Sequence, residues 1–295
     1  MKRDWKAAAD DYRKSVDQRL QDFLLIDEYE PLSGFAEAIR YSLLAGGKRI
    51  RAILFLEFCR ICGGDPARAL DVACGIEMLH AYSLIHDDLP CMDNDDLRRG
   101  KPTNHIVYGE CTATLAGDAL QAEAFQTILH CDLPPIARLR CAEALSEAVG
   151  FDGMCGGQYL DMIGEGKILT AEELDAINIR KTGALITACC RMGVYAADGT
   201  EEQAEAAAHF GAAVGLAFQI RDDMLDVLST EEELGKPIGS DQQEQKNTYM
   251  AVYGAEICEE RIQKLNQAAK ESIRRCFNDT GFLEQLADSL AARNK

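Results

Sequence analysis

Two groups of aspartates are the residues of this sequence best suited to chemistry. The first group lies between residues 87 and 96 and consists of Asp87, Asp88, Asp93, Asp95 and Asp96. Carboxylates this close together repel one another, so they need either bound cations or full solvation. The spacing therefore predicts a cation site at the end of the apolar segment that precedes the group.

The second group is far downstream, in the apolar run GLAFQIRDDMLDVL, and consists of Asp222, Asp223 and Asp226. Residues three and four apart share one side of a helix, so a helix would place these carboxylates together. Mg²⁺ prefers oxygen ligands and usually takes one or two carboxylates together with substrate phosphates. Two acidic groups beside apolar helices therefore indicate a cavity with carboxylates at its mouth.

Basic residues that could hold an anion accompany both groups. The run Gly46-Gly47-Lys48-Arg49-Ile50-Arg51 is typical of a glycine turn that opens a helix, where amides and cations suit a phosphate. A solvated helix start would explain the same run. Arg98 and Arg99 could likewise be simple charge compensation for the first group. The remaining candidates are Lys181, next to Thr182, and Lys236, which follows the second group.

Composition restricts the partners. The formal net charge of −18 argues against nucleic acid, and an anionic substrate would need local cations or metal bridges. The twelve cysteines include one CxxC pair, Cys59 and Cys62, without the second pair that a zinc site needs. Unpatterned thiols are typical of a reducing compartment. Because we find neither an apolar signal core nor a run of about 18 apolar residues, we expect a cytoplasmic protein without membrane insertion.

The periodicity predicts an all-α protein. Strand signals are nearly absent, and Thr170 with Glu173, like Thr200 with Gln203, has the spacing of a capping box. Asp65-Pro66 should open a helix. We expect helices over about 4–26, 34–45, 48–62, 66–88, 110–130, 135–149, 156–164, 171–195, 200–228, 248–275 and 280–292. The prediction is one domain over residues 1–295, a large bundle of roughly ten or more helices around a central cavity.

Other carboxylate chemistries fit poorly. Counted from Asp93, a calcium loop of the EF-hand kind would place its glycine at Arg98 and its glutamate at Asn104. A carboxylate-bridged di-iron bundle would need Glu-x-x-His pairs, which are absent from the sequence. Acid–base catalysis by two aspartates would leave most of the first group unexplained. Two aspartate groups with dispersed Lys and Arg instead fit a diphosphate held by Mg²⁺.

With these motifs in order, the chain resembles the trans-isoprenyl diphosphate synthase family nearly from end to end. The first family motif, DDxxxxD, matches DDLPCMD, and the second, DDxxD, matches DDMLD. The segments GGKRIR, LRRGKPTNH, KTG and a downstream GK also match. Terpene cyclases share the fold and one such motif, but they usually carry an NSE-type second metal motif. The resemblance implies the isoprenoid synthase fold and a homodimer.

The resemblance also implies roles for single residues. Mg²⁺ would be bound by Asp87, Asp88, Asp93, Asp222, Asp223 and Asp226. Isopentenyl diphosphate would be bound by Gly47, Lys48, Arg51, His80 and Arg99, and the allylic diphosphate by Arg98, Lys181, Lys236 and Lys246. Thr182 and Gln219 would lie near the reacting carbon, and Gln158 and Asp161 would act indirectly. The glycine usual before the last lysine is replaced by Gln245.

The implied reaction is Mg²⁺-dependent head-to-tail prenyl transfer, with three Mg²⁺ ions and with Mn²⁺ as a possible substitute. The ions draw electrons from the allylic diphosphate, either dimethylallyl or geranyl, until its C–O bond breaks. The double bond of isopentenyl diphosphate attacks the carbocation, and the departing diphosphate takes up the proton that is lost. Positioning and electrostatic stabilisation supply the catalysis, and an apolar cavity excludes water.

Product length depends on the helix that carries Asp87. Tyr82 lies five residues earlier, about 7.5 Å deeper at about 1.5 Å per residue, and Ser83 above it is small. In the family the fifth position before the first aspartate is a length determinant, and a bulky ring there is typical of synthases that stop at fifteen carbons. We therefore predict farnesyl diphosphate as the product. Tyr82 could instead be an ordinary core aromatic, with the floor built by another helix.

Three other functions remain open. The first is synthesis of twenty-carbon geranylgeranyl diphosphate, because very similar family members make it. A class I terpene cyclase is disfavoured by the complete set Lys48, Arg51, His80 and Arg99. A non-catalytic synthase subunit would be expected to lose aspartates, and both groups are complete.

Overall fold

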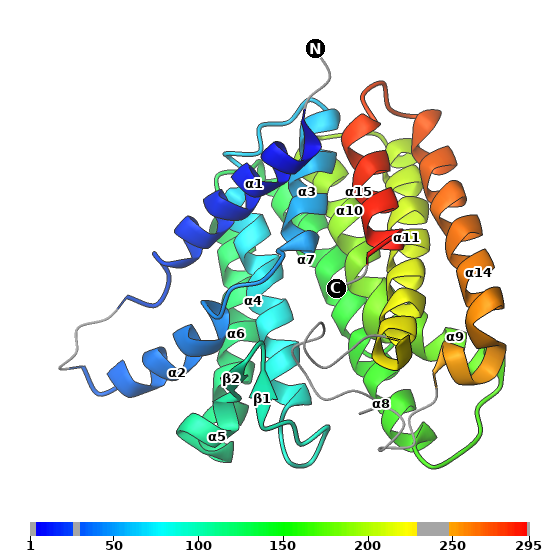
Figure 1. The fold of residues 1–295 in the computed structure, drawn as a ribbon. Coiled ribbons are helices and arrows are strands. Elements are labelled where there is room, and N and C mark those ends of the chain that lie inside the picture. Colours follow the sequence, from blue (N-terminus) through cyan, green and yellow to red (C-terminus); the bar gives the residue numbers. More distant parts are fainter. Residues whose placement is uncertain (1–3, 26–29, 229–247, 294–295) are drawn as a thin grey trace.

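The computed structural model describes residues 4–25, 30–228 and 248–293, and this part of the chain is almost entirely helical (Figure 1). The helices are α1 (Trp5–Leu20), α2 (Ser33–Leu43), α3 (Ile50–Ile61), α4 (Leu70–Asp87), α5 (Asn104–Tyr108), α6 (Glu110–His130), α7 (Pro135–Val149), α8 (Met154–Gly164), α9 (Ala171–Asn178), the π-helix η1 (Ile179–Gly183), α10 (Ala184–Ala196), α11 (Glu201–Leu228), α14 (Tyr249–Arg274) and α15 (Gly281–Ala291). Two short antiparallel strands, β1 (Leu97–Arg98) and β2 (Lys101–Pro102), form a hairpin after α4. The prediction of an all-α bundle with ten or more helices is confirmed.

The core is built from helices of both halves of the chain. One large cluster of buried apolar residues joins α1, α3, α4, α6, α7, α10, α11 and α15. Within it, the rings of Phe58 and Phe210 meet edge to face at 5.5 Å between centroids, which ties α3 to α11. A smaller cluster around Ile220, Tyr249 and Ile262 fastens α14 to α11, and Figure 1 shows these two helices side by side. The buried faces thus bring α4 and α11, which carry the two aspartate groups, into one bundle.

Several helix boundaries follow from local signals. The predicted ranges of α6 and α7 agree with the structure, with Pro135 at the first position of α7. Both predicted capping boxes are confirmed: Glu173 N donates to Thr170 Oγ1 at 3.3 Å, and Gln203 N donates to Thr200 Oγ1 at 3.2 Å. In each box the N3 side chain also accepts from the cap backbone at 2.9 Å. These hydrogen bonds satisfy amides that a helix start leaves without partners.

Three predicted boundaries are wrong. Asp65-Pro66 does not open α4; the Asp65 carboxylate accepts from Ala67 N at 2.9 Å in a turn, and α4 begins at Leu70. The first helix stops at Leu20, and Leu24 takes a left-handed φ of 56°, which no α-helix continues. The helix expected over 171–195 is divided by η1.

None of the helices described combines the length and apolar character needed to cross a lipid bilayer.

Small residues on α11 let it approach its neighbours, as their four-residue spacing suggests. A Cβ added at Gly211 would lie 2.7 Å from Thr187 Cα on α10, and one at Gly215 would lie 3.1 Å from Gly183 Cα on η1. Contacts this short leave no room for a side chain. Gln219, one turn further along α11, is consequently brought next to the π-helix.

Candidate active site

The first aspartate group lies at the end of α4. Asp87 is the last residue of the helix, and Asp93 N donates to the Asp87 carbonyl at 2.9 Å, so the following loop folds back over the helix end. Burial raises the pKa of Asp87 to about 6; the charges of Asp93 and Asp88 add to the rise, while Lys181 and Arg98 oppose it. This carboxylate therefore lies where a negative charge is costly unless a cation joins it.

The β1–β2 hairpin brings a cation to the same group. Arg98 Nε donates to Asp88 Oδ1 at 2.6 Å, and Arg98 Nη2 lies 3.2 Å from Asp95 Oδ2. Burial raises the pKa of Asp88, and Arg98 opposes that rise. The structure therefore brings Arg98 to the aspartates of the first group.

The second group faces two different neighbours. Asp222 Oδ1 lies 2.6 Å from Arg293 Nη2, just beyond α15. Asp223 is buried, and its two oxygens accept from Gln219 Nε2 at 3.0 Å and from Tyr249 N at 2.7 Å. Asp226 is also buried, with 2% of its surface exposed. Asp222 and Asp223 are thus adjacent in sequence but have different surroundings.

The π-helix η1 presents Lys181 and Thr182 to the site. Lys181 Nζ lies 2.6 Å from Asp161 Oδ2 on α8, and Thr182 Oγ1 donates to Gln219 Oε1 at 3.1 Å. A Cβ at Gly157 would lie 2.3 Å from Lys181 N, so glycine is required where α8 touches the η1 backbone. A π turn holds more residues per turn than an α turn and so shifts which side chains face a neighbour. The periodicity of the sequence carried no signal for this turn.

A basic cavity of about 400 Å³ lies between α3, α4, α11 and α15. Arg51 Nη1 is 3.3 Å from His80 Nε2. Burial, reinforced by the Arg51 charge, lowers the pKa of His80 well below 6.5, so this imidazole is neutral. Because an arginine only donates, Nε2 is the accepting nitrogen and we assign the proton to Nδ1. Residues proposed for isopentenyl diphosphate line this cavity: Gly47, Lys48, Arg51, His80 and Arg99.

The glycine turn meets Arg99 closely. Arg99 donates to the Gly46 carbonyl, and a Cβ at Gly47 would lie 2.9 Å from Arg99 Nη1. Gly47 also has a φ of 141°, which side chains rarely adopt. Glycine is therefore required for both the backbone conformation and the approach of the guanidinium.

A second cavity, of about 450 Å³, shares Arg51 and His80 with the basic cavity; we call it the Tyr82 cavity. Both volumes are within the range usual for small-molecule sites. Tyr82 has 9% of its surface exposed, and its hydroxyl lies 3.7 Å from Cys155 Sγ. The other lining residues include Ser83, Asp87, Met92, Met154, Gln158, Met162, Lys181 and Thr182. Tyr82 and Ser83 thus border a cavity that also reaches Asp87, and their control of product length stays a prediction.

The carboxylates suit a Mg²⁺ ion that is bound by the protein and the substrate together. Within the described residues, no three His, Cys, Asp or Glu side chains come close enough to form a metal cage by themselves. A cation beside Asp87 would offset the cost of burying the charged carboxylate and would reduce its repulsion by Asp93. Carboxylate oxygens are ligands that Mg²⁺ accepts, with phosphate oxygens and water completing its shell.

The structure adds residues that the sequence analysis missed and leaves two untested. Arg293 lines the basic cavity and pairs with Asp222, although the sequence near the C-terminus carries no motif that would indicate this. Arg49, expected to offer its charge to a phosphate, makes three bonds to protein groups instead. Lys236 and Lys246 lie outside the described residues.

The fold and the site define a predominantly helical protein whose carboxylates and cations line two neighbouring cavities, suited to anionic substrates with apolar tails. The chain belongs to the polyprenyl synthetase family, whose model matches residues 33–284.

Individual relatives agree with this assignment. The chain is 47% identical over 272 residues to the farnesyl diphosphate synthase of Geobacillus stearothermophilus, covering 91% of this chain and 92% of the relative. It is 46% identical over 261 residues to the geranylgeranyl diphosphate synthase of Cyanophora paradoxa, covering 88% and 87%. An FPP/GFPP synthase from Zymomonas mobilis superposes with a TM-score of 0.87 at 33% identity, covering 98% of this chain and 99% of the other. The predicted isoprenoid synthase fold is thereby confirmed.

Proposed function

We propose that this protein is a prenyltransferase that condenses isopentenyl diphosphate with dimethylallyl diphosphate and then with geranyl diphosphate, giving farnesyl diphosphate. The observation that carries the proposal is that Arg51 and His80 line both cavities, so the two cavities lie on either side of the same side chains. A basic cavity suits one diphosphate, and the neighbouring cavity has Asp87 and Lys181 for a second. The farnesyl diphosphate synthase at 47% identity supports the same reaction.

Members of this family are generally Mg²⁺-dependent, and we propose three Mg²⁺ ions, replaceable by Mn²⁺. When bound, they supply positive charge that weakens the C–O bond of the allylic diphosphate. The proposed ligands are Asp87, Asp88, Asp93 and Asp222, with Asp223 and Asp226 nearby.

The remaining binding residues divide between the two diphosphates. Gly47, Lys48, Arg51, His80 and Arg99 would hold isopentenyl diphosphate. Arg98, Lys181, Lys236 and Lys246 would hold the allylic diphosphate.

Thr182 and Gln219 would face the developing carbocation. The Thr182 hydroxyl donates a hydrogen bond to Gln219 Oε1, so the lone pairs of the hydroxyl oxygen are available to face positive charge. A hydroxyl dipole oriented in advance stabilises a cation without reorganising during the reaction. The neutral His80 avoids adding a further positive charge beside Arg51.

Tyr82 supports a fifteen-carbon product because its ring borders the cavity that also holds Asp87. Geranylgeranyl diphosphate remains the second candidate because several relatives at comparable identity are named as its synthases. The two products require different depths of cavity beyond Tyr82, and analysis of the product chain length distinguishes them.

We further propose that residues 1–295 form one domain, that two copies form a homodimer, and that the protein is cytoplasmic. Large apolar side chains are exposed on three neighbouring helices, among them Leu115 on α6, Leu139 on α7 and Tyr159 on α8, which a second copy would cover. All twelve cysteines are free thiols, which suits a reducing compartment.

The decisive experiment is incubation with isopentenyl and dimethylallyl diphosphates plus Mg²⁺, followed by chromatographic analysis of the dephosphorylated products. We expect mainly farnesol, and no product when a chelator removes the metal. Mainly geranylgeraniol would replace the product assignment but keep the reaction, and absence of any condensation would refute the proposal. Light scattering of the same preparation tests the dimer.

A further inference from the structure

Three cations follow the glycine turn, and one of them is bound by the protein itself. Arg49 has 6% of its surface exposed, although Lys48 before it is exposed. It is the N-cap residue of α3 and has a left-handed φ of 51°. A non-glycine residue is strained in this conformation, so the surrounding contacts must hold it there.

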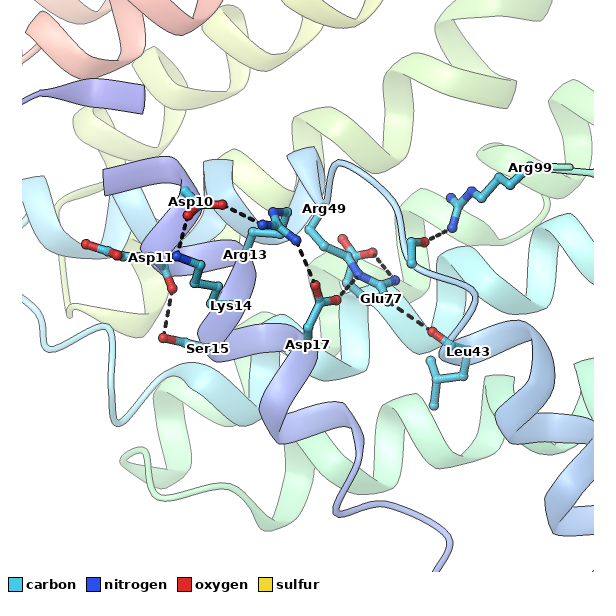
Figure 2. Close-up of polar contacts among 11 residues, drawn as sticks. Asp10, Asp11, Arg13, Lys14, Ser15, Asp17, Leu43, Arg49, Glu77 and Arg99 are labelled. Carbon is cyan, nitrogen blue, oxygen red and sulfur yellow. Dashed lines mark hydrogen bonds and ion pairs between the residues drawn. The ribbon is translucent and has the colours of Figure 1, made fainter. Parts of the chain in front are cut away.

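Those contacts tie the start of α3 to three other helices, α1, α2 and α4 (Figure 2). Arg49 Nε donates to Asp17 Oδ1 of α1 at 2.9 Å, and Nη1 donates to Glu77 Oε2 of α4 at 3.1 Å. Nη2 donates to the Leu43 carbonyl at 3.1 Å. Leu43 ends α2, where carbonyls have no partner within the helix. One planar guanidinium thus fastens the end of α2 and the start of α3 to α1 and α4.

Glu77 closes the arrangement from the other side. Its Oε1 accepts from Ala52 N, in the first turn of α3, at 3.3 Å. With 2% of its surface exposed, Glu77 is a buried charge that needs its partner. Arg49 and Glu77 therefore hold both ends of the short segment that contains Lys48 and Arg51.

Of this pair, Glu77 counters the positive charge of the basic cavity, whereas the charge of Arg49 lowers the pKa of Arg99. Glu77 lies one turn before His80 on α4, and its charge raises the pKa of Arg51 and Arg99 against the larger lowering by burial. Without such a counter-charge, several cations gathered in one partly buried cavity would repel one another. Arg49 fixes the position of that carboxylate.

We propose that Arg49 is a positioning residue for the isopentenyl diphosphate side of the site. It holds the turn 46–51 so that Lys48 and Arg51 converge on one diphosphate. Arg49 itself borders the basic cavity, but its guanidinium nitrogens donate to Asp17, Glu77 and Leu43. The inference rests on the proposed function and deepens it, because it assigns the turn to one of the two substrates.

The test is steady-state kinetics of Arg49→Met with each substrate varied in turn. We expect the KM for isopentenyl diphosphate to rise at least tenfold, while the KM for geranyl diphosphate changes less than twofold. Arg49→Lys keeps the charge but cannot make the three-way contact, so it should give an intermediate rise. A purely structural role would lower the melting temperature without this split between substrates.

Arg60→Met is the matched control. Arg60 lies on the same helix and donates to the buried Glu57 at 3.0 and 2.7 Å and to Asp279 at 2.8 Å, outside the residues that line the two cavities. Its loss should reduce stability and leave both KM values unchanged.

Equal rises in both KM values, or unchanged KM values with lowered stability, would overturn the inference. If Arg49→Met does not fold, Asp17→Ala removes one of the three contacts and should raise the KM for isopentenyl diphosphate selectively by a smaller factor; no rise would overturn the inference. Wild-type protein that fails to condense the substrates would refute the proposed function, a result distinguishable from failure of the Arg49 inference.

Discussion

The two aspartate groups have the same residue type but opposite surroundings. The first lies at the end of α4 and in the loop that follows, where burial and neighbouring carboxylates raise the pKa of Asp87 to about 6. The second lies within α11, where Asp223 accepts from a side-chain amide and from the backbone N–H of Tyr249. One group is costly to keep charged without a cation, and the other contains a carboxylate that stabilises the fold.

The second group therefore combines a proposed role in metal binding with hydrogen bonds that join α11 to the start of α14. We expect Asp87 to matter for turnover and not for folding, and Asp223 to matter for both. The effects of substitutions on folding and on turnover can therefore be told apart by measuring stability without metal and activity with metal.

The largest expected effect follows from Asp87→Ala or Asp222→Ala. Each should lower turnover at saturating Mg²⁺ by at least about 100-fold, equivalent to about 2.7 kcal/mol of barrier. The melting temperature of metal-free Asp87→Ala should stay the same or rise, because a costly buried charge has been removed. Retention of more than about a tenth of wild-type activity by either variant would contradict its assignment as a metal ligand.

Tyr82→Ala tests whether the helix of the first group also sets product length. Removing the ring should open the Tyr82 cavity and give products of twenty or more carbons, at a stability cost of about 3–5 kcal/mol. Tyr82→Phe keeps the ring, so it should still make the fifteen-carbon product. Product chromatography gives the answer, and a folded, active Tyr82→Ala that makes only farnesyl diphosphate would show that another residue is the stop.

Asp223→Ala should lower the stability of the metal-free protein, unlike Asp87→Ala. The buried Tyr249 N–H and the Gln219 amide would lose their acceptor, which costs about 1–3 kcal/mol for each unsatisfied group. Urea denaturation of the metal-free protein should therefore show a lower midpoint than for wild type or Asp87→Ala. An unchanged midpoint would mean that Asp223 has no structural role.

The smallest effect is expected from Arg293→Gln. Its ion pair with Asp222 is partly exposed, with 18% and 34% of the side-chain surfaces accessible, so its loss should cost less than about 1 kcal/mol. Because Asp222 would no longer be paired with this cation, we expect half-maximal activity at a lower Mg²⁺ concentration, by up to about fivefold. A shift to higher Mg²⁺ would indicate that Arg293 assists binding in the site.

Much of the architecture could be predicted because its signals are local. The ranges of α6 and α7 and the capping boxes at Thr170 and Thr200 depend on residues within about one helical turn. Hydrophobic period and caps report such short-range contacts directly. The motif spacing likewise identified the family.

The tertiary structure alone decided the partners of individual side chains. The sequence placed Lys48, Arg49 and Arg51 together as phosphate ligands, yet Arg49 bonds to Asp17, Glu77 and Leu43. It gave no indication of the π turn at Lys181 or of Arg293 beside Asp222. These contacts join residues far apart in the chain, and which of them form depends on how the helices pack; a local pattern does not contain that information.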